Sequence, residues 1–350
     1  MKNKKYLLNL IIILLVTTLT IYFLIAKSLL TKEVFISISL VNVLCVFVVY
    51  LFSVIIYAFV DYLCVKKSLV NFTFLNALTD VVFGRLGSDI TPYKSGHFPL
   101  RIYSYISNNF SFYEGLSGVT RTQIVVSFSS VVNYLILFFI LLANKRSVNL
   151  EGVNVGLHLV VGVGALFHVG SIVLSMLLAF VKPFQKFCIN LVASIRFRKN
   201  EEKREEFIGE QVVKYQVYKE QVILLLKEFY KYILPMLTYA LYLYLITSFI
   251  YLSYLLLSKE IFSFDGFIKF YLLSLCLTYI SNVIPIPGGN GSSEGLFVLL
   301  FPLLIGENLL VGTLMLWRIS CYYLPVLFGG IFFLLVSLIK KRHKRIKNQV

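Results

Sequence analysis

Long apolar runs recur along this 350-residue sequence and constrain its fold more than any other feature. A helix needs about 20 apolar residues to cross a bilayer. Runs of that order occupy 7–26, 36–60, 122–143, 153–181, 229–257 and 309–338. Hydrophobic residues make up 58% of the chain and charged residues only 14%, a balance that soluble proteins of this size do not carry. The sequence therefore predicts an all-α, polytopic integral membrane protein with about six spanning helices.

Basic residues gather at the two chain ends and in one central loop. Lys2, Lys4 and Lys5 precede the first apolar run, and 182–231 is rich in Lys and Arg. Because cytoplasmic loops of membrane proteins carry an excess of Lys and Arg, we expect both termini and 182–231 in the cytoplasm, and 144–152 outside. The net charge of +16 is explained by this distribution. Nucleic acid is not expected as a partner.

The cysteines and histidines form no pattern typical of a metal site. The five cysteines are dispersed, lie mostly within apolar runs and show no CxxC spacing, and the four histidines form no ligand-spaced cluster. We therefore expect neither a metal site nor another cofactor.

Two stretches, 68–121 and 266–305, contain prolines and glycines that would leave backbone groups without hydrogen-bond partners in hydrocarbon. The first contains "SDITPYKSGHFPLR" and the second "PIPGGNG". The loop charges require the first stretch to begin and end inside, and the second to begin and end outside. We therefore predict two re-entrant hairpins of broken helices, related as an inverted repeat and meeting near the midplane. Irregular backbone at that depth needs protein or a polar cavity around it.

The sequence predicts one large membrane domain with a short appendage. The transmembrane domain covers 1–339, and 340–350 is a basic cytoplasmic tail. Within the loop 182–231, apolar residues recur near one helical face, which predicts an amphipathic helix at the cytoplasmic interface. A solvated charged linker is the alternative.

The second break has the residues of an anion site at a helix start. Three glycines permit backbone conformations closed to other residues: Gly288, Gly289 and Gly291. Asn290, Ser292 or Ser293 can cap the helix that follows, and its free N–H groups suit a lipid phosphate. Glu294 falls in the first turn, where a carboxylate is favoured. Alternatively, Glu294 only caps the helix or pairs with a buried arginine.

Two arginines are the candidate contacts for a lipid head group. Arg318 lies inside the last apolar run, where a charged side chain normally faces a cavity or a partner. Arg101 follows closely after Pro99 in the first break. We expect Arg318 and Glu294 to face a shared cavity, either as an ion pair or as a head-group ligand and a helix cap.

Three motifs together resemble one known family. The second break fits P-x-P-G-G-x-G-x-x-E through Pro285, Pro287, Gly288, Gly289, Gly291 and Glu294, and the last run fits W-R-x-x-x-Y-Y-L-P through Trp317, Arg318, Tyr322, Tyr323, Leu324 and Pro325. The first break fits T-P-x-x-x-G-G-[QE]-P through Thr91, Pro92, Gly96 and Pro99, but His97 and Phe98 depart from it. The chain resembles the lysylphosphatidylglycerol synthase transmembrane region, or flippase-like domain, which includes the membrane half of the bacterial multiple peptide resistance factor.

The resemblance implies translocation of an anionic or aminoacylated phospholipid between the leaflets of a bacterial cytoplasmic membrane. Membrane phospholipids are then the partners, and homo-oligomer formation stays open. The family name also implies a phosphatidylglycerol lysyltransferase. That activity is not expected, because only a short tail follows residue 338 where the synthases carry a soluble domain. A third hypothesis is a non-transporting membrane partner of a separately encoded lipid-modifying enzyme.

Overall fold

The protein is an all-α membrane protein, as predicted. The computed structural model describes residues 38–143, 147–150, 153–196, 201–283, 289 and 291–347. The predicted first span, 7–26, lies outside the described residues. The long helices are α3 (Leu40–Val65), α6 (Phe112–Ala143), α7 (Leu157–Phe180), α9 (Glu201–Lys227), α12 (Phe264–Val283) and α15 (Leu324–Lys347).

Shorter elements connect these helices. The shorter helices are α4 (Phe74–Asp89), α5 (His97–Ser107), α8 (Lys182–Arg196), α10 (Ile233–Thr247), α11 (Phe249–Ser258), α13 (Ser292–Leu300) and α14 (Glu307–Arg318). Three 3-10 turns, η1 (Pro92–Lys94), η2 (Phe229–Tyr232) and η4 (Phe301–Leu303), and one π-helical segment, η5 (Ile319–Tyr323), lie between them. A small antiparallel hairpin, β1 (Ser147–Leu150) with β2 (Val153–Gly156), joins α6 to α7.

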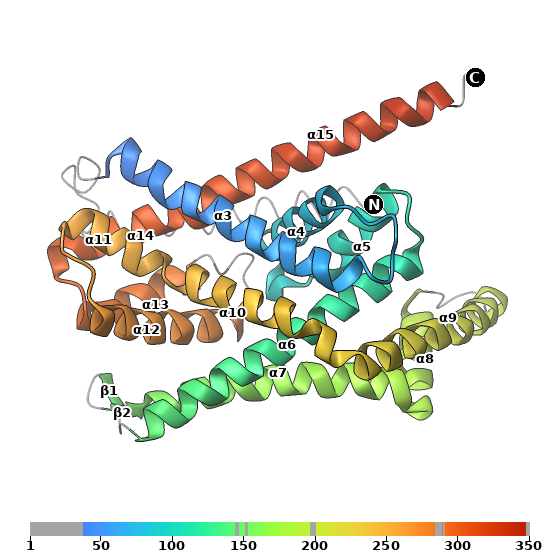
Figure 1. The fold of residues 1–350 in the computed structure, drawn as a ribbon, viewed down its shortest axis with the longest axis horizontal. Coiled ribbons are helices and arrows are strands. Elements are labelled where there is room, and N and C mark those ends of the chain that lie inside the picture. The colour runs from blue at the N-terminus through green and yellow to red at the C-terminus, as the bar shows by residue number, and fades with distance from the viewer. Residues whose placement is uncertain are drawn as a thin grey trace.

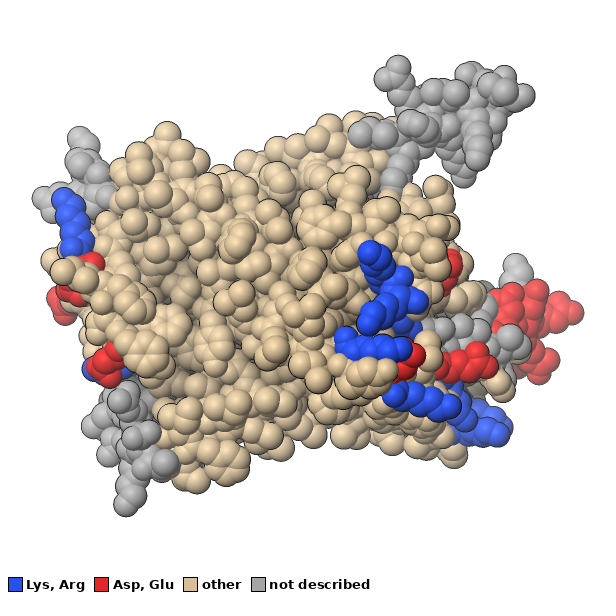
Figure 2. Space-filling view, in the orientation of Figure 1, with Lys and Arg blue, Asp and Glu red and all other residues tan. Residues whose placement is uncertain are grey.

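Four helical segments of the described chain are long and apolar enough to cross a membrane: 40–65, 112–142, 229–247 and 307–338. A fifth span results if 168–180 and 182–191, which meet at 97°, are counted as one. The long helices run along the long axis of the molecule (Figure 1). Lysine, arginine and acidic residues gather near the two ends of that axis, with an uncharged belt between them on the face shown (Figure 2). The chain is a multi-pass membrane protein.

The predicted span 229–257 is divided into α10 and α11 at Ser248. The Thr247 hydroxyl donates to the carbonyl of Leu243 at 2.7 Å, and the Ser248 hydroxyl donates to that of Leu245 at 2.7 Å. Such back-bonding competes with the helical ladder and bends helices. A sequence reading based on apolar length therefore overlooks this division.

Two helical hairpins lie where the re-entrant stretches are predicted. α4 packs against α5, and α12 packs against α13. Figure 1 shows the first pair toward one end of the long axis and the second pair toward the other. Each hairpin follows one membrane segment and precedes another: α3 and α6 for the first, α10–α11 and α14 for the second. This order and the opposite placement are those of the predicted inverted repeat.

The central loop contains helices α8 and α9. α9 packs against α6, α7 and α8, and its last turns bury Val222 and Leu225 in the same apolar cluster that holds the first hairpin. This part of α9 is thus joined to the membrane domain instead of forming a solvated linker. At the other end of the chain, α15 continues as one helix across the predicted domain boundary at 339, to Lys347.

Candidate functional site

Hydrogen bonds to the side chain of Thr91 hold the backbone turn at the first break. The Thr91 hydroxyl donates to the carbonyl of Gly87 at 2.6 Å and accepts the backbone N–H of Gly96 at 2.7 Å. Pro92 occupies the first position of η1, where a missing N–H costs nothing. The next two residues, Tyr93 and Lys94, take left-handed backbone angles with φ of 53° and 55°. The motif residues of this break therefore act on the backbone of the turn.

The two arms of the first hairpin touch backbone to backbone. A Cβ atom on Gly96 would lie 2.6 Å from the carbonyl oxygen of Gly87, and one on Gly87 would lie 2.3 Å from that of Gly96. Real Cβ atoms do not come so close to backbone atoms. Both positions therefore require glycine.

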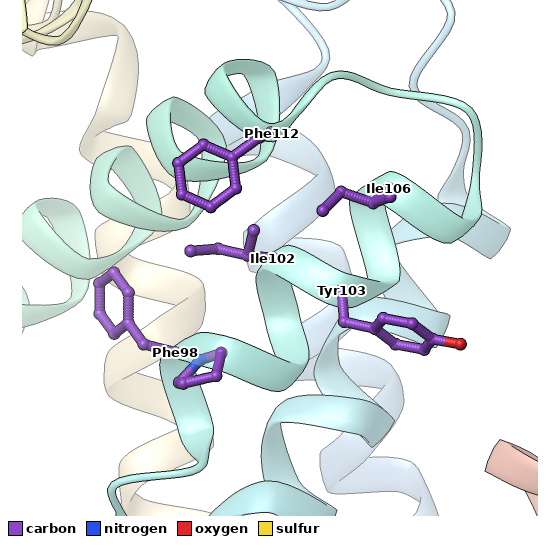
Figure 3. Close-up of a pocket in the computed structure, with 6 residues that line it drawn as sticks. Phe98, Ile102, Tyr103, Ile106 and Phe112 are labelled. Carbon is purple, nitrogen blue, oxygen red and sulfur yellow. The ribbon is translucent and has the colours of Figure 1, made fainter. Parts of the chain in front are cut away.

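His97 and Phe98, which depart from the family motif, have separate surroundings. The Nδ1 atom of His97 lies 3.1 Å from both the carbonyl of Gly84 and the hydroxyl of Ser88, so the ring is attached to α4. Phe98 lines an apolar hollow of about 350 Å³ between α5 and the start of α6 (Figure 3). The other lining residues are Pro99, Ile102, Tyr103, Ile106 and Phe112, and the ring of Tyr103 points away from the labelled side chains. This side of the first hairpin is apolar.

The second break is described in part. Gly289 and Gly291 have positive φ, 65° and 79°, which glycine adopts without strain. The hydroxyl of Ser292 donates to the carbonyl of Gly289 at 3.0 Å, and the N–H of Gly291 donates to Oε2 of Glu294 at 2.7 Å. Glu294 thus caps α13 at the backbone of Gly291, which is the N-cap in place of the predicted Asn290, Ser292 or Ser293. Four residues of this prediction lie outside the described part of the chain: Pro285, Pro287, Gly288 and Asn290.

Glu294 also forms a buried ion pair with Arg318. Arg318 Nε lies 2.7 Å from Oε1 of Glu294, and the two side chains are only 5% and 6% exposed. The guanidinium lies over the ring of Tyr322 at 4.3 Å, and the rings of Trp317 and Tyr323 are also within reach. An arginine inside a membrane domain needs such partners because its charge is costly there. In this arrangement the pair is closed off from solvent.

Tyr322 connects this pair to the first hairpin. Its hydroxyl donates to the carbonyl of Asp89, the last residue of α4, at 3.1 Å. The Asp89 carboxylate pairs with Arg85 at 2.9 Å, and Arg85 is 39% exposed. Contacts therefore run from Glu294 on α13, through Arg318 and Tyr322, to the end of α4. Sequence reasoning gave Tyr322 no role beyond the family motif, and its place four residues after Arg318 in that motif was the available signal.

Arg101, on α5, lies away from this pair. It is fully buried and contacts α3 and α4. Its Nε donates to Asp80 of α4 at 2.6 Å, and its Nη2 donates to Asp61 of α3 at 2.5 Å. Thr122 of α6 donates to the same Asp61 oxygen at 2.7 Å. The head-group contact predicted for Arg101 finds no support in this geometry, because both edges of the side chain face protein. Sequence reasoning missed Asp61 and Asp80, although each is an isolated acid in an apolar run.

The comparison with known families is decisive for identity. The model of the lysylphosphatidylglycerol synthase TM region matches residues 62–329, which is most of the chain. The chain belongs to this family. The match includes both hairpins and the Arg318–Tyr322 segment. No curated protein matches the chain. Membership of the lysylphosphatidylglycerol synthase TM family gives the protein a role connected with membrane lipids.

Proposed function

We propose that this protein translocates a phospholipid with an anionic or aminoacylated head group between the two leaflets, and that the head group binds where the two hairpins meet. The observation that supports the proposal is the buried Arg318–Glu294 pair at the start of α13. The family gives the connection with lipids. The direction of movement and the head group are part of the proposal.

The chemistry of this pair suits a lipid phosphate. A guanidinium binds phosphate through charge-assisted hydrogen bonds, and the N–H groups at a helix start add partial positive charge. Glu294 presents one carboxylate oxygen to Arg318 and the other to the N–H of Gly291. A phosphate has oxygens of the same kind and can take both contacts when Glu294 swings away. Glu294 therefore holds the site closed until a head group replaces it.

Access to the site requires the hairpins to separate. Arg318 and Glu294 are buried, and the Tyr322–Asp89 contact joins the second half of the molecule to the first. In transporters built from inverted repeats, one part rocks against the other around a central site. We propose that the same motion opens Arg318 alternately to each leaflet.

Reconstitution into vesicles tests the proposal. Vesicles would contain phosphatidylglycerol with a fluorescent acyl chain, and an impermeant reductant added outside would quench only the outer leaflet. We expect wild-type protein to make the inner pool accessible and Arg318→Ala to remove this activity while still inserting. Lys269→Ala is the matched control, because Lys269 pairs with Asp265 on an exposed surface. Wild-type rates equal to those of protein-free vesicles would refute the proposal.

A further inference from the structure

Three charged side chains form a closed cluster away from the Arg318–Glu294 pair. Asp61 on α3, Asp80 on α4 and Arg101 on α5 are all 0% exposed. Nε and Nη2 of Arg101 both contact Oδ2 of Asp80, at 2.6 and 2.5 Å, and Nη2 also contacts Oδ1 of Asp61 at 2.5 Å. Two carboxyl groups thus share one guanidinium nitrogen, and they interact with each other as well.

The cluster has buried polar atoms without hydrogen-bond partners, and they include one donor, Nη1 of Arg101, as well as acceptors. Oδ2 of Asp61 and Oδ1 of Asp80 are buried and have no hydrogen-bond partner in the structure, and the same holds for the hydroxyl of Tyr105. That hydroxyl lies against Gly118, whose carbonyl accepts from Thr122, the residue that also donates to Asp61. Buried polar atoms are nearly always paired in folded proteins. The polar groups of this cluster therefore lack part of the pairing that buried polar groups normally have.

The surroundings supply further titratable and charged groups. Those that face the cluster are Tyr57 and Cys64 on α3, His97 and Tyr105 on α5, and Arg121 on α6. Arg121 is the second cation, and it interacts with Cys64 and with Tyr232 of η2. His97 is engaged with Gly84 and Ser88 on α4. Arg101 is the cation that touches both carboxyl groups.

We propose that Asp61 and Asp80 share one proton and that the cluster around Arg101 is a proton-binding site. One guanidinium balances one carboxylate, so a second ionised carboxylate would leave a net negative charge in a dry interior. Two carboxylates bound to the same guanidinium nitrogen repel each other when both carry a charge, and one guanidinium cannot neutralise both. A proton held by either carboxyl group removes the excess charge while the other carboxylate stays paired with Arg101.

The position of the cluster connects its proton to the first hairpin. Its members stand on a membrane span and on both arms of the hairpin. Any shift of α5 relative to α3 would take Arg101 from one carboxylate and change which group holds the proton. This inference does not depend on the proposed lipid translocation, and its test uses purified protein without lipid transport.

Infrared spectroscopy can detect this proton directly. The carbonyl stretch of a protonated carboxylic acid is separate from carboxylate and amide bands, and it shifts in heavy water. The chain has four aspartates, Asp61, Asp80, Asp89 and Asp265, so carbon-13 labelling of aspartate assigns the band. We expect one protonated aspartic acid in wild-type protein in nanodiscs at neutral pH. Absence of such a band would overturn the proposal.

Substitutions locate the proton. Asp61→Asn and Asp80→Asn should each remove the band, because each leaves one ionised carboxylate opposite Arg101. Asp265→Asn, at an exposed pair, should leave the band in place. The double Asp61→Asn, Asp80→Asn variant should melt below either single variant, because Arg101 is then unpaired. Survival of the band in both single variants would overturn the proposal.

Two further outcomes would overturn the proposal and assign the neutralising charge to another group. A band that appears only when sodium is withdrawn would assign the site to a metal cation in place of a proton. A band that is absent in wild type and appears in Arg121→Gln would show that Arg121 neutralises the second carboxylate. Under the proposal, the wild-type band is independent of sodium and persists in Arg121→Gln.

Discussion

The two hairpins of this protein hold their charges in different ways. In the first, Arg101 is enclosed by Asp80 of the hairpin itself and by Asp61 of the neighbouring span α3, so the charge fixes the hairpin to α3. In the second, Arg318 pairs with Glu294, a carboxylate that belongs to the hairpin itself and also caps it. The first arrangement is a structural anchor, while under the proposed function the second exchanges Glu294 for a lipid phosphate. An inverted repeat can therefore divide the tasks of anchoring and binding between its halves.

The largest expected effect is on the anchor. Arg101→Ala leaves two buried carboxyl groups without their cation, which should cost about 3–5 kcal/mol of stability. We expect thermal unfolding of the purified protein at a much lower temperature, or loss of folded protein. Lys67→Ala, at an exposed position just after the end of α3, is the control. A melting temperature close to that of wild type would remove the distinction between anchor and binding site.

The second pair should tolerate disruption better. Glu294→Gln keeps an oxygen for the N–H of Gly291 but removes the charge opposite Arg318, which should cost about 1.5–3 kcal/mol. The loss is smaller than at Arg101 because three aromatic rings still surround the guanidinium. Thermal unfolding of Glu294→Gln, Arg318→Ala and the double variant gives the coupling energy. A double variant as unstable as the sum of the two single ones would show that the pair does not contribute to the fold.

The turn of the first hairpin should also tolerate substitution of its glycine less well than the turn of the second. Gly96→Ala places Cβ against the backbone of Gly87, which cannot yield, at about 1–3 kcal/mol. Gly289→Ala places Cβ 2.7 Å from the hydroxyl of Ser293, at the end of a side chain that can turn away, and adds the strain of a positive φ, at about 1–2 kcal/mol. Gly295→Ala, with nothing within 4 Å, is the control. Unfolding temperatures that rank Gly289→Ala below Gly96→Ala would reverse the comparison.

The smallest change tests the link between the halves. Tyr322→Phe removes the hydrogen bond to Asp89 but keeps the ring over Arg318, at about 0.5–1.5 kcal/mol. If this contact holds the site closed, translocation in vesicles should become faster while the melting temperature falls only slightly. Slower translocation would instead mean that the contact is needed during transport.

Sequence patterns were sufficient for the parts of the fold that depend on local order. Apolar length located the four long spans of the described chain, and proline–glycine runs located both breaks. The Arg318–Glu294 contact was among the alternatives because each residue stands out in its own segment. The anchor was missed because Asp61, Asp80 and Arg101 come from three segments, and only packing of α3, α4 and α5 brings them together. The division at Ser248 was missed because hydroxyl back-bonding leaves hydropathy unchanged.

The π-helical segment η5 sets how far α15 is rotated about its axis relative to α14. A π turn contains one more residue than an α turn, and each residue of an α-helix advances by about 100°. The upstream side chains can therefore serve the second hairpin, as Arg318 does, while the downstream ones face the first, where Phe333 packs on Phe83 at 4.9 Å. Deleting one residue within Ile319–Tyr323 would convert this segment to regular helix. The whole of α15 would then turn by about 100°, carrying Phe333 away from Phe83 while Arg318 stayed in place.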